Sequence, residues 1–175
     1  MSGRRGRAKE VQTFSPALSA VVARLESLAD TRSAAGMKRF AAGGEQTLGI
    51  SIPVLRKMAK EIGRSHELAR ELWSTGLHEA RILASMIDEP ACLTERQMEE
   101  WVAGFDSWDL TDQVCMNLLS KAPLAWAKAV EWAAREREFE RRAGFALMAC
   151  LAWYEAEAPE ARFKPFLRAA EQASE

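Results

Sequence analysis

The sequence predicts an all-α fold. Apolar residues recur at three- and four-residue steps through most of the 175 residues, and no stretch shows the two-residue alternation of a strand. Serine, threonine and proline precede these apolar stretches, and glycine follows several of them, which is the order of helix start and stop signals. With 48% hydrophobic and 28% charged residues, the chain has the composition of a globular protein with its own core.

The last predicted helix of the N-terminal half cannot continue past Pro90, because proline has no N–H for the helical hydrogen bonds. Ser15 and Pro16 begin the first of these helices. Residues 1–14 are expected to form a mobile basic tail, so that a single α-helical repeat domain spans residues 15–175. The helices expected before Pro90 lie at about 16–28, near Lys38, and at 51–63, 65–76 and 77–87.

The next helix begins at Thr94. Thr94 followed by Gln97 is a capping box, in which each side chain bonds the backbone N–H of the other residue. A helix start is also expected at Asp106 or Ser107, either of which can cap it. The remaining helices are expected at about 107–120, 123–134, 138–153 and 158–173.

The predicted helices come in pairs, and each pair occupies about 30–40 residues, which is the length of one helical repeat. Three segments at similar spacing are faintly alike: ELW ending at Trp73, EEW ending at Trp101 and VEW ending at Trp132. One pair of short amphipathic helices cannot bury its apolar face alone, so neighbouring pairs stack. We therefore expect a HEAT-like helical repeat, a right-handed superhelical stack of antiparallel helix pairs.

The formal net charge of −1 argues against a protein that binds polyanions over its whole surface, but the charges are unevenly distributed. Residues 32–64 hold seven basic and two acidic side chains, whereas residues 82–120 hold one basic and eight acidic ones. A local basic face could hold phosphates; the alternative is that both segments are ordinary solvated helix faces. No apolar run approaches the ~20 residues of a membrane span, and no hydrophobic segment follows the basic N-terminus. A cytoplasmic protein without a membrane partner is expected.

Cysteine and histidine give no sign of a metal site or of disulfides. Cys92, Cys115 and Cys150 are widely spaced within apolar patterns and are expected to be buried, reduced thiols. The two histidines stand at no spacing known for a metal site, so no metal and no cofactor are expected. Trp132 and Trp153 stand within predicted helices and are expected in the core.

The densest cluster of polar and aromatic residues is the segment 105–113. A carboxylate in the first helical turn, such as Asp109, complements the helix dipole and needs no functional explanation. Asp112 lies beyond the first turn and four residues after Trp108, so the two side chains share a helix face. An aromatic ring beside a carboxylate can hold a cationic, sugar-like species. The alternative is a core tryptophan beside a solvated aspartate.

The chain resembles the bacterial AlkD-like DNA-alkylation-repair proteins from about residue 35 to residue 151. The matching segments occur in the family's order, and the Trp-x-x-x-Asp element is the most specific of them. They are residues 36–40, 48–56, 71–73, 78–81, 108–112 and 140–143.

This resemblance implies HEAT-like helix pairs around a basic DNA-binding channel, and removal of cationic N3- or N7-alkylated purines from duplex DNA by an N-glycosylase. It makes Asp112 the catalytic carboxylate, Trp108 an aromatic packed against the deoxyribose, and Arg142 a DNA contact beside the site. It also implies action without a base-specific pocket, by a grip on the backbone and the sugar. The basic residues it places near phosphates are Lys38, Arg39, Arg56 and Lys57.

Family members usually continue with a further helix pair that carries a second tryptophan at the sugar, and no residue up to Glu175 matches that motif. A partner or a further segment could complete this end of the channel. Two other functions are therefore kept open: a non-catalytic module that binds nucleic acid or protein, and a helical scaffold without a ligand.

Overall fold

The computed structural model describes residues 15–39, 42 and 46–173, apart from the side chain of Lys38. The tail predicted at residues 1–14 lies outside the described residues. Within them, the chain forms α-helices and short 3-10 helices and no strand. The elements are α1 (Pro16–Ser27), α2 (Thr31–Arg39), α3 (Ile52–Ile62), α4 (His66–Ser74), α5 (His78–Ile87), η1 (Pro90–Cys92), α6 (Glu95–Ala103), α7 (Trp108–Asn117), η2 (Leu119–Lys121), α8 (Ala125–Ala133), α9 (Glu138–Tyr154), η3 (Glu160–Arg162) and α10 (Lys164–Ala173).

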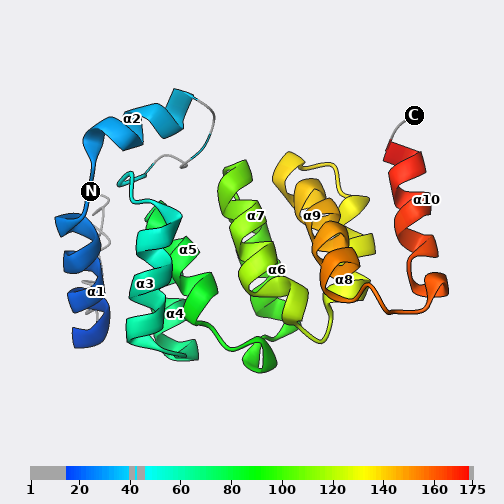
Figure 1. Ribbon diagram of the computed structural model, residues 1–175, viewed down its shortest axis with the longest axis horizontal. Helices are drawn as coiled ribbons and strands as arrows, with labels where there is room; N and C mark the ends of the chain where they lie inside the picture. The colour runs from blue at the N-terminus through cyan, green and yellow to red at the C-terminus, as the bar shows by residue number, and fades with distance from the viewer. Residues whose placement is uncertain (1–14, 40–41, 43–45, 174–175) are drawn as a thin grey trace, which may run out of the picture.

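The helices stack in a row, as the repeat pattern predicts. α5 contacts α3, α4 and α7, and α7 in turn contacts α9, which packs against α8. Figure 1 shows α3, α7 and α9 side by side along the front of the row, with α1 at one end and α10 at the other. α2 lies crosswise above the end of the row that α1 forms (Figure 1). The predicted all-α, HEAT-like fold is therefore confirmed.

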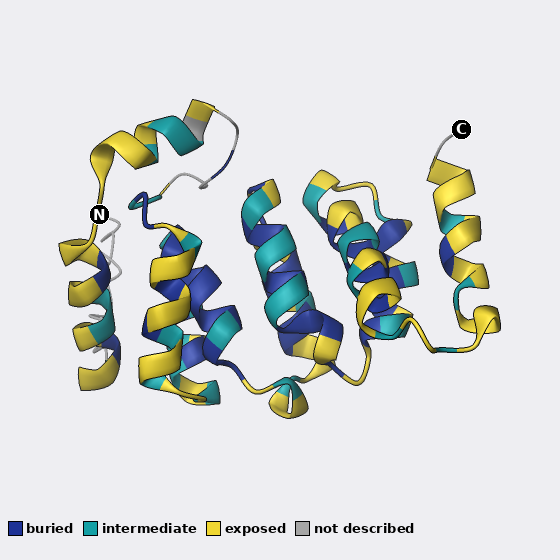
Figure 2. Cartoon of the chain, viewed as in Figure 1, coloured by how far each residue is buried: buried dark blue, intermediate teal, exposed yellow. Residues whose placement is uncertain are grey.

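The centre of the core is α5, in which nine of the ten residues are buried (Figure 2). Its apolar residues pack toward α3, α4 and α7. Besides Ser85, three of its buried residues are polar or charged: His78, Glu79 and Arg81. Because a buried charge is costly unless it is paired, these three side chains must be bonded to the elements around α5.

α8 and α9 approach each other at Gly144. A methyl group on Gly144 would overlap the backbone N of Ala133 and lie 2.6 Å from its Cα and 2.8 Å from the carbonyl oxygen of Ala129. Real Cβ atoms do not come this close to backbone, so only glycine fits here. The two helices are therefore in backbone contact.

We expect Gly144→Ala to destabilise the protein by about 2 kcal/mol or more, because the added methyl forces α8 and α9 apart. Chemical unfolding followed by circular dichroism measures this change. Gly36→Ala is the matched control, since Gly36 lies in helix α2 with open space around it. In that case alanine should be neutral or stabilising by up to about 1 kcal/mol, through its higher helix propensity. Equal effects of the two substitutions would contradict the close packing.

Local capping explains most helix starts. The side chains of Ser15, Ser65 and Thr94 each accept a hydrogen bond from the backbone N–H three residues later, as predicted. The second half of the capping box is absent, because the Gln97 amide donates instead to the buried Asp88 carboxylate at 2.8 Å. α7 ends at Asn117, earlier than predicted, and a 3-10 turn follows.

Two of the burial predictions are wrong. Trp132 is fully buried, as predicted, but Trp153 is 82% exposed. Trp153 lies in the last turn of α9, two residues and so about 200° around the helix from the buried Leu151. Cys92 is exposed because it ends the 3-10 helix that joins α5 to α6.

The other two cysteines lie in α7 and α9 and are free thiols. Cys115 is buried, and burial raises the pKa of its thiol well above the usual value. Cys150 is half-buried, and burial raises its pKa as well. Both thiols therefore stay protonated near neutral pH, in line with an apolar packing role.

Candidate functional site

The first turn of α7 is fastened to α5. Arg81 of α5 donates from Nη1 to the carbonyl oxygen of Gly104 at 2.8 Å and pairs through Nη2 with Oδ2 of Asp106 at 2.6 Å. One residue into α7, Oδ2 of Asp109 lies 2.9 Å from Nε2 of the buried His78. These bonds fix where α7 begins, and they use two of the buried polar groups of α5.

The predicted side-chain cap of α7 is wrong. Ser107 occupies the N-cap position, but its side chain makes no capping hydrogen bond. Asp106 is turned to Arg81 and not to the helix N-terminus. The guanidinium of Arg81 competes for this carboxylate, and a charge-assisted bond is stronger than a neutral cap.

One turn further along α7, Asp112 forms a two-bond ion pair with Arg142 of α9. Nε of Arg142 donates to Oδ1 at 2.9 Å and Nη2 donates to Oδ2 at 2.7 Å. Cζ of the same guanidinium lies 5.9 Å from the ring centroid of Trp108, within cation–π range. The structure thus brings together three predicted site residues from two helices.

This cluster is open to solvent. The side chains of Asp112 and Arg142 are 34% and 43% exposed, and Trp108 is 41% exposed. The hydrogen bonds from Arg142 to Asp112 raise the pKa of the guanidinium, so Arg142 stays charged. Asp112 is therefore a reachable carboxylate that is held in place by a permanent cation.

Asp112 and Met116 form a ridge between two hollows, and both residues line both of them. The first, which we call the α7–α9 hollow, has a volume of about 400 Å³. It is lined by Asp112, Met116, Arg142, Phe145, Ala146, Ala149 and Cys150.

The second, which we call the α7–α2 hollow, has a volume of about 510 Å³ and lies between α7, α2 and the start of α3. Ile50 and Ile82, which line it, are buried residues of the core, so this hollow reaches inward. Its other lining residues are Ser33, Met37, Gly49, Ser51, Ile52, Trp108, Asp109, Asp112, Gln113 and Met116.

The wall of the α7–α2 hollow opposite α7 is held by the buried carboxylate of Glu79. Oε1 of Glu79 accepts from the backbone N–H of Gly49 at 2.7 Å and from the hydroxyl of Thr47 at 2.8 Å. It also accepts from the N–H of Ile50 at 3.2 Å, and Oε2 accepts from the N–H of Leu48 at 2.8 Å. A carboxylate that accepts several N–H bonds is well satisfied without a cation.

Sequence reasoning did not identify Glu79 as a residue of the site. The available signal was three polar residues, His78, Glu79 and Arg81, at the start of an otherwise apolar helix. Their hydrogen-bond partners are 23 to 32 residues away in the chain, so no local sequence pattern could identify those partners.

The predicted phosphate-binding residues lie on α2 and α3. Arg56 and Lys57 are exposed on α3, and Arg39 is exposed at the end of α2. The side chain of Lys38 lies outside the described residues. Figure 1 shows α7 between α3, the helix of Arg56 and Lys57, and α9, the helix of Arg142.

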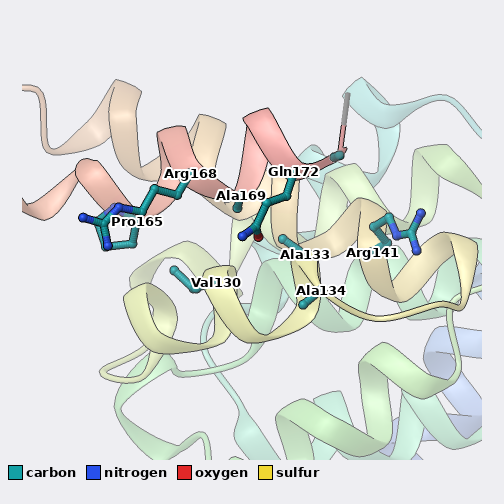
Figure 3. Close-up of a pocket in the computed structure, with 9 residues that line it drawn as sticks. Val130, Ala133, Ala134, Arg141, Pro165, Arg168, Ala169 and Gln172 are labelled. Carbon is teal, nitrogen blue, oxygen red and sulfur yellow. The ribbon is translucent and has the colours of Figure 1, made fainter. Parts of the chain in front are cut away.

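A third hollow, of about 650 Å³, lies between α8, α9 and α10 (Figure 3). Arg141 lines it, and Nε of Arg141 donates to the carbonyl oxygen of Arg135 at 2.7 Å. The neighbouring Arg142 lines the α7–α9 hollow. This third hollow is therefore separate from the Asp112 cluster.

Comparison with known proteins gives the family of the chain. A family model described as "DNA alkylation repair enzyme" matches residues 21–174. The search of curated proteins found no match. In the part of the chain that the structure describes, no helix is both long enough and apolar enough to cross a membrane.

One solved structure is similar, with a TM-score of 0.73 and 26% sequence identity. It is described as "A new family of proteins related to the HEAT-like repeat DNA glycosylases with affinity for branched DNA structures". The match covers 82% of this chain and 61% of that structure, so this chain spans less than two thirds of the length of its relative. Because the family model covers most of the sequence, the chain belongs to the DNA alkylation repair enzyme family.

Proposed function

We propose that this protein is a DNA N-glycosylase that hydrolyses the N-glycosidic bond of cationic N3- or N7-alkylated purines in duplex DNA. The observation that carries the proposal is the solvent-reachable carboxylate of Asp112, one turn from the exposed ring of Trp108 and held by Arg142. Membership of the DNA alkylation repair enzyme family supports it.

The proposed reaction needs few catalytic groups. An alkylated purine with a formal positive charge is already a good leaving group, so the site needs no strong general acid. As the bond breaks, the sugar becomes oxocarbenium-like, and a fixed carboxylate stabilises that charge and orients the attacking water. Asp112 supplies the carboxylate, and Trp108 offers its ring to the sugar.

Arg142 has two tasks in this proposal. It holds Asp112 in one orientation through two parallel bonds, and it presents a permanent positive charge to the DNA backbone. A guanidinium has five N–H donors, and Asp112 takes two of them. A phosphate can therefore bind the remaining donors while the carboxylate stays oriented toward the sugar.

The test is an excision assay with duplex DNA that contains 7-methylguanine, in which release of the free base is followed by chromatography. We expect wild-type protein to release the base faster than the spontaneous reaction does. Release at the spontaneous rate at every protein concentration would contradict the proposal.

A second candidate function is binding of branched DNA without base excision, since the similar solved structure is described as a family with affinity for such DNA. Binding of a four-way junction and of the matching linear duplex separates the two. A strong preference for the junction, together with no excision, would favour the second candidate.

We expect Arg56 and Lys57 to contact phosphates. Replacing either by alanine should then weaken duplex binding for all sequences and lower the salt slope of the binding constant by about 1, because fewer counterions are released. Fluorescence anisotropy at several salt concentrations measures this. Arg96→Ala is the control, since Arg96 is 88% exposed on α6 and paired with Glu100. An unchanged slope in the α3 variants would place the duplex elsewhere.

A further inference from the structure

We propose that Trp153 is a second DNA contact of this protein, which packs against the sugar–phosphate backbone about five nucleotides from the damaged one. The inference rests on the proposed function and deepens it. It adds an aromatic contact at a distance from Asp112, outside the group of residues that the proposed reaction uses.

Trp153 continues the face of α9 that lines the α7–α9 hollow. Arg142, Ala146 and Ala149 line this hollow at steps of four and three residues. Trp153 follows after a further step of four, so its side chain points to the same side of the helix. The hollow therefore leads from the Asp112 cluster toward the Trp153 ring.

The Trp153 ring is open to solvent. At 82% exposure it is the most exposed of the large apolar side chains that the structure describes. Glu155, the nearest acidic residue in the chain, lies about 200° around the helix and is bonded to Trp126 and Arg162. A ligand that covers the Trp153 ring buries a large apolar surface, which is favourable.

Two cations lie near this end of the α7–α9 hollow. Burial raises the pKa of the Cys150 thiol, and the charge of Lys121 acts in the opposite direction, so these two side chains are close. Partial burial and the charge of Arg64 both lower the pKa of the Lys121 ammonium. Within the described part of the chain, both cations donate to backbone carbonyls, Lys121 to Asn117 at 2.8 Å and Arg64 to Met86 at 3.2 Å, and neither pairs with a carboxylate. Their charges are therefore available to an anion.

An exposed indole near two such cations has the features of a site for a nucleic-acid strand, in which an aromatic ring packs on the sugar or base and cations bind phosphates. Arg142 and Trp153 are eleven residues apart, so about 16 Å separates them along the helix axis. One strand of duplex DNA advances about 3.4 Å per nucleotide, so this distance spans about five nucleotides.

A strand whose phosphate is held by Arg142 at the damaged nucleotide can therefore reach Trp153 further along the duplex. The same distance keeps Trp153 away from the sugar at Asp112. Because the ring lies on the face that also carries Arg142, DNA is favoured over a protein partner as the ligand that covers it.

The test compares Trp153→Ala with Trp153→Phe, which keeps a ring, and with the matched control Tyr154→Ala. Tyr154 is the next residue of α9 and is 53% exposed, but it points about 100° away around the helix. The side chain of Trp153 makes little contact with the core, so its variants should fold. Thermal unfolding checks this for all three.

The first readout is binding of duplex DNA with a central tetrahydrofuran abasic site, measured by fluorescence anisotropy at several salt concentrations. Trp153→Ala should bind about tenfold more weakly, the cost of losing one aromatic contact to a strand. The salt slope of its binding constant should not change, because an indole releases no counterions. Trp153→Phe should recover most of the affinity, and Tyr154→Ala should bind like wild type.

The cations have their own signature. Lys121→Gln should lower the salt slope by about 1, because one phosphate contact is lost. An unchanged slope in this variant would remove Lys121 from the contact.

The second readout is the length of DNA that the protein needs. The abasic site is placed about three or about eight base pairs from one end of the duplex, and each end is tested in turn, so that only the longer arm reaches about five nucleotides. Wild type should prefer the longer arm at one of the two ends, and Trp153→Ala should lose this preference.

Unchanged DNA binding in Trp153→Ala, or an equal loss in Tyr154→Ala, would overturn the proposal and leave the ring to a protein partner. Excision separates this outcome from a failure of the proposed function. If wild type releases 7-methylguanine and Trp153→Ala binds both lengths like wild type, the contact is wrong and the glycosylase function stands. If wild type releases no base but Trp153→Ala loses the preference for the longer arm, the glycosylase function is wrong and the contact stands.

Discussion

Asp112→Asn should lower the rate of 7-methylguanine release by about 100- to 1000-fold, the usual cost of removing one preorganised electrostatic group from a reaction centre. Asparagine keeps the shape of the side chain and can still accept one hydrogen bond from Arg142, but it carries no charge. The charge is what stabilises the oxocarbenium-like sugar. Binding of DNA with an abasic site should change little, so the loss appears in kcat.

The control for this experiment is Glu100→Gln, which removes an exposed carboxylate that is paired with Arg96 on α6 and lines neither hollow. It should leave the excision rate within a few-fold of wild type. Single-turnover kinetics with enzyme in excess measures the chemical step directly. Equal activity of the Asp112 variant and wild type would remove Asp112 from the reaction.

Glu79→Ala should be the most destabilising single change near the site, with a loss of about 3–5 kcal/mol of unfolding free energy. It leaves the N–H groups of Leu48, Gly49 and Ile50 without their acceptor, and an unsatisfied buried donor costs about 1–3 kcal/mol. Urea unfolding followed by circular dichroism measures the loss. The outcome matters for the site because these N–H groups belong to one wall of the α7–α2 hollow.

Glu100→Ala is the matched control, since Glu100 is an exposed partner of Arg96 on α6. An exposed ion pair contributes about 0–1 kcal/mol, so this variant should stay close to wild type. If Glu79→Ala unfolds at the same urea concentration as Glu100→Ala, the segment after α2 is not held by Glu79.

Much of the fold could be predicted from the sequence because its signals are local. Apolar spacing and the caps at Ser15, Ser65 and Thr94 depend on residues within one helical turn of each other. The same reasoning failed for Trp153, because a helical period says which residues share a face but not whether another helix covers that face. At the end of α9 the side of Trp153 is left open.

The candidate site was only partly predictable for the same reason. The shared face of Trp108 and Asp112 follows from their spacing of four, and the structure agrees. The pair between Asp112 and Arg142 joins residues 30 positions apart, and the ridge between two hollows depends on how α2, α7 and α9 are placed. Competition among partners also matters, since the Gln97 side chain bonds the Asp88 carboxylate and not the backbone at the start of its own helix.

The backbone contact at Gly144 has a consequence for how the molecule can flex. Because the backbones of α8 and α9 meet there without a side chain between them, we expect the two helices to move as one unit. A bend at this end of the stack is then expected to open between α7 and α9. The ion pair of Asp112 and Arg142 bridges these two helices. A change of curvature at this end of the stack is therefore expected to act first on the pair that holds Asp112.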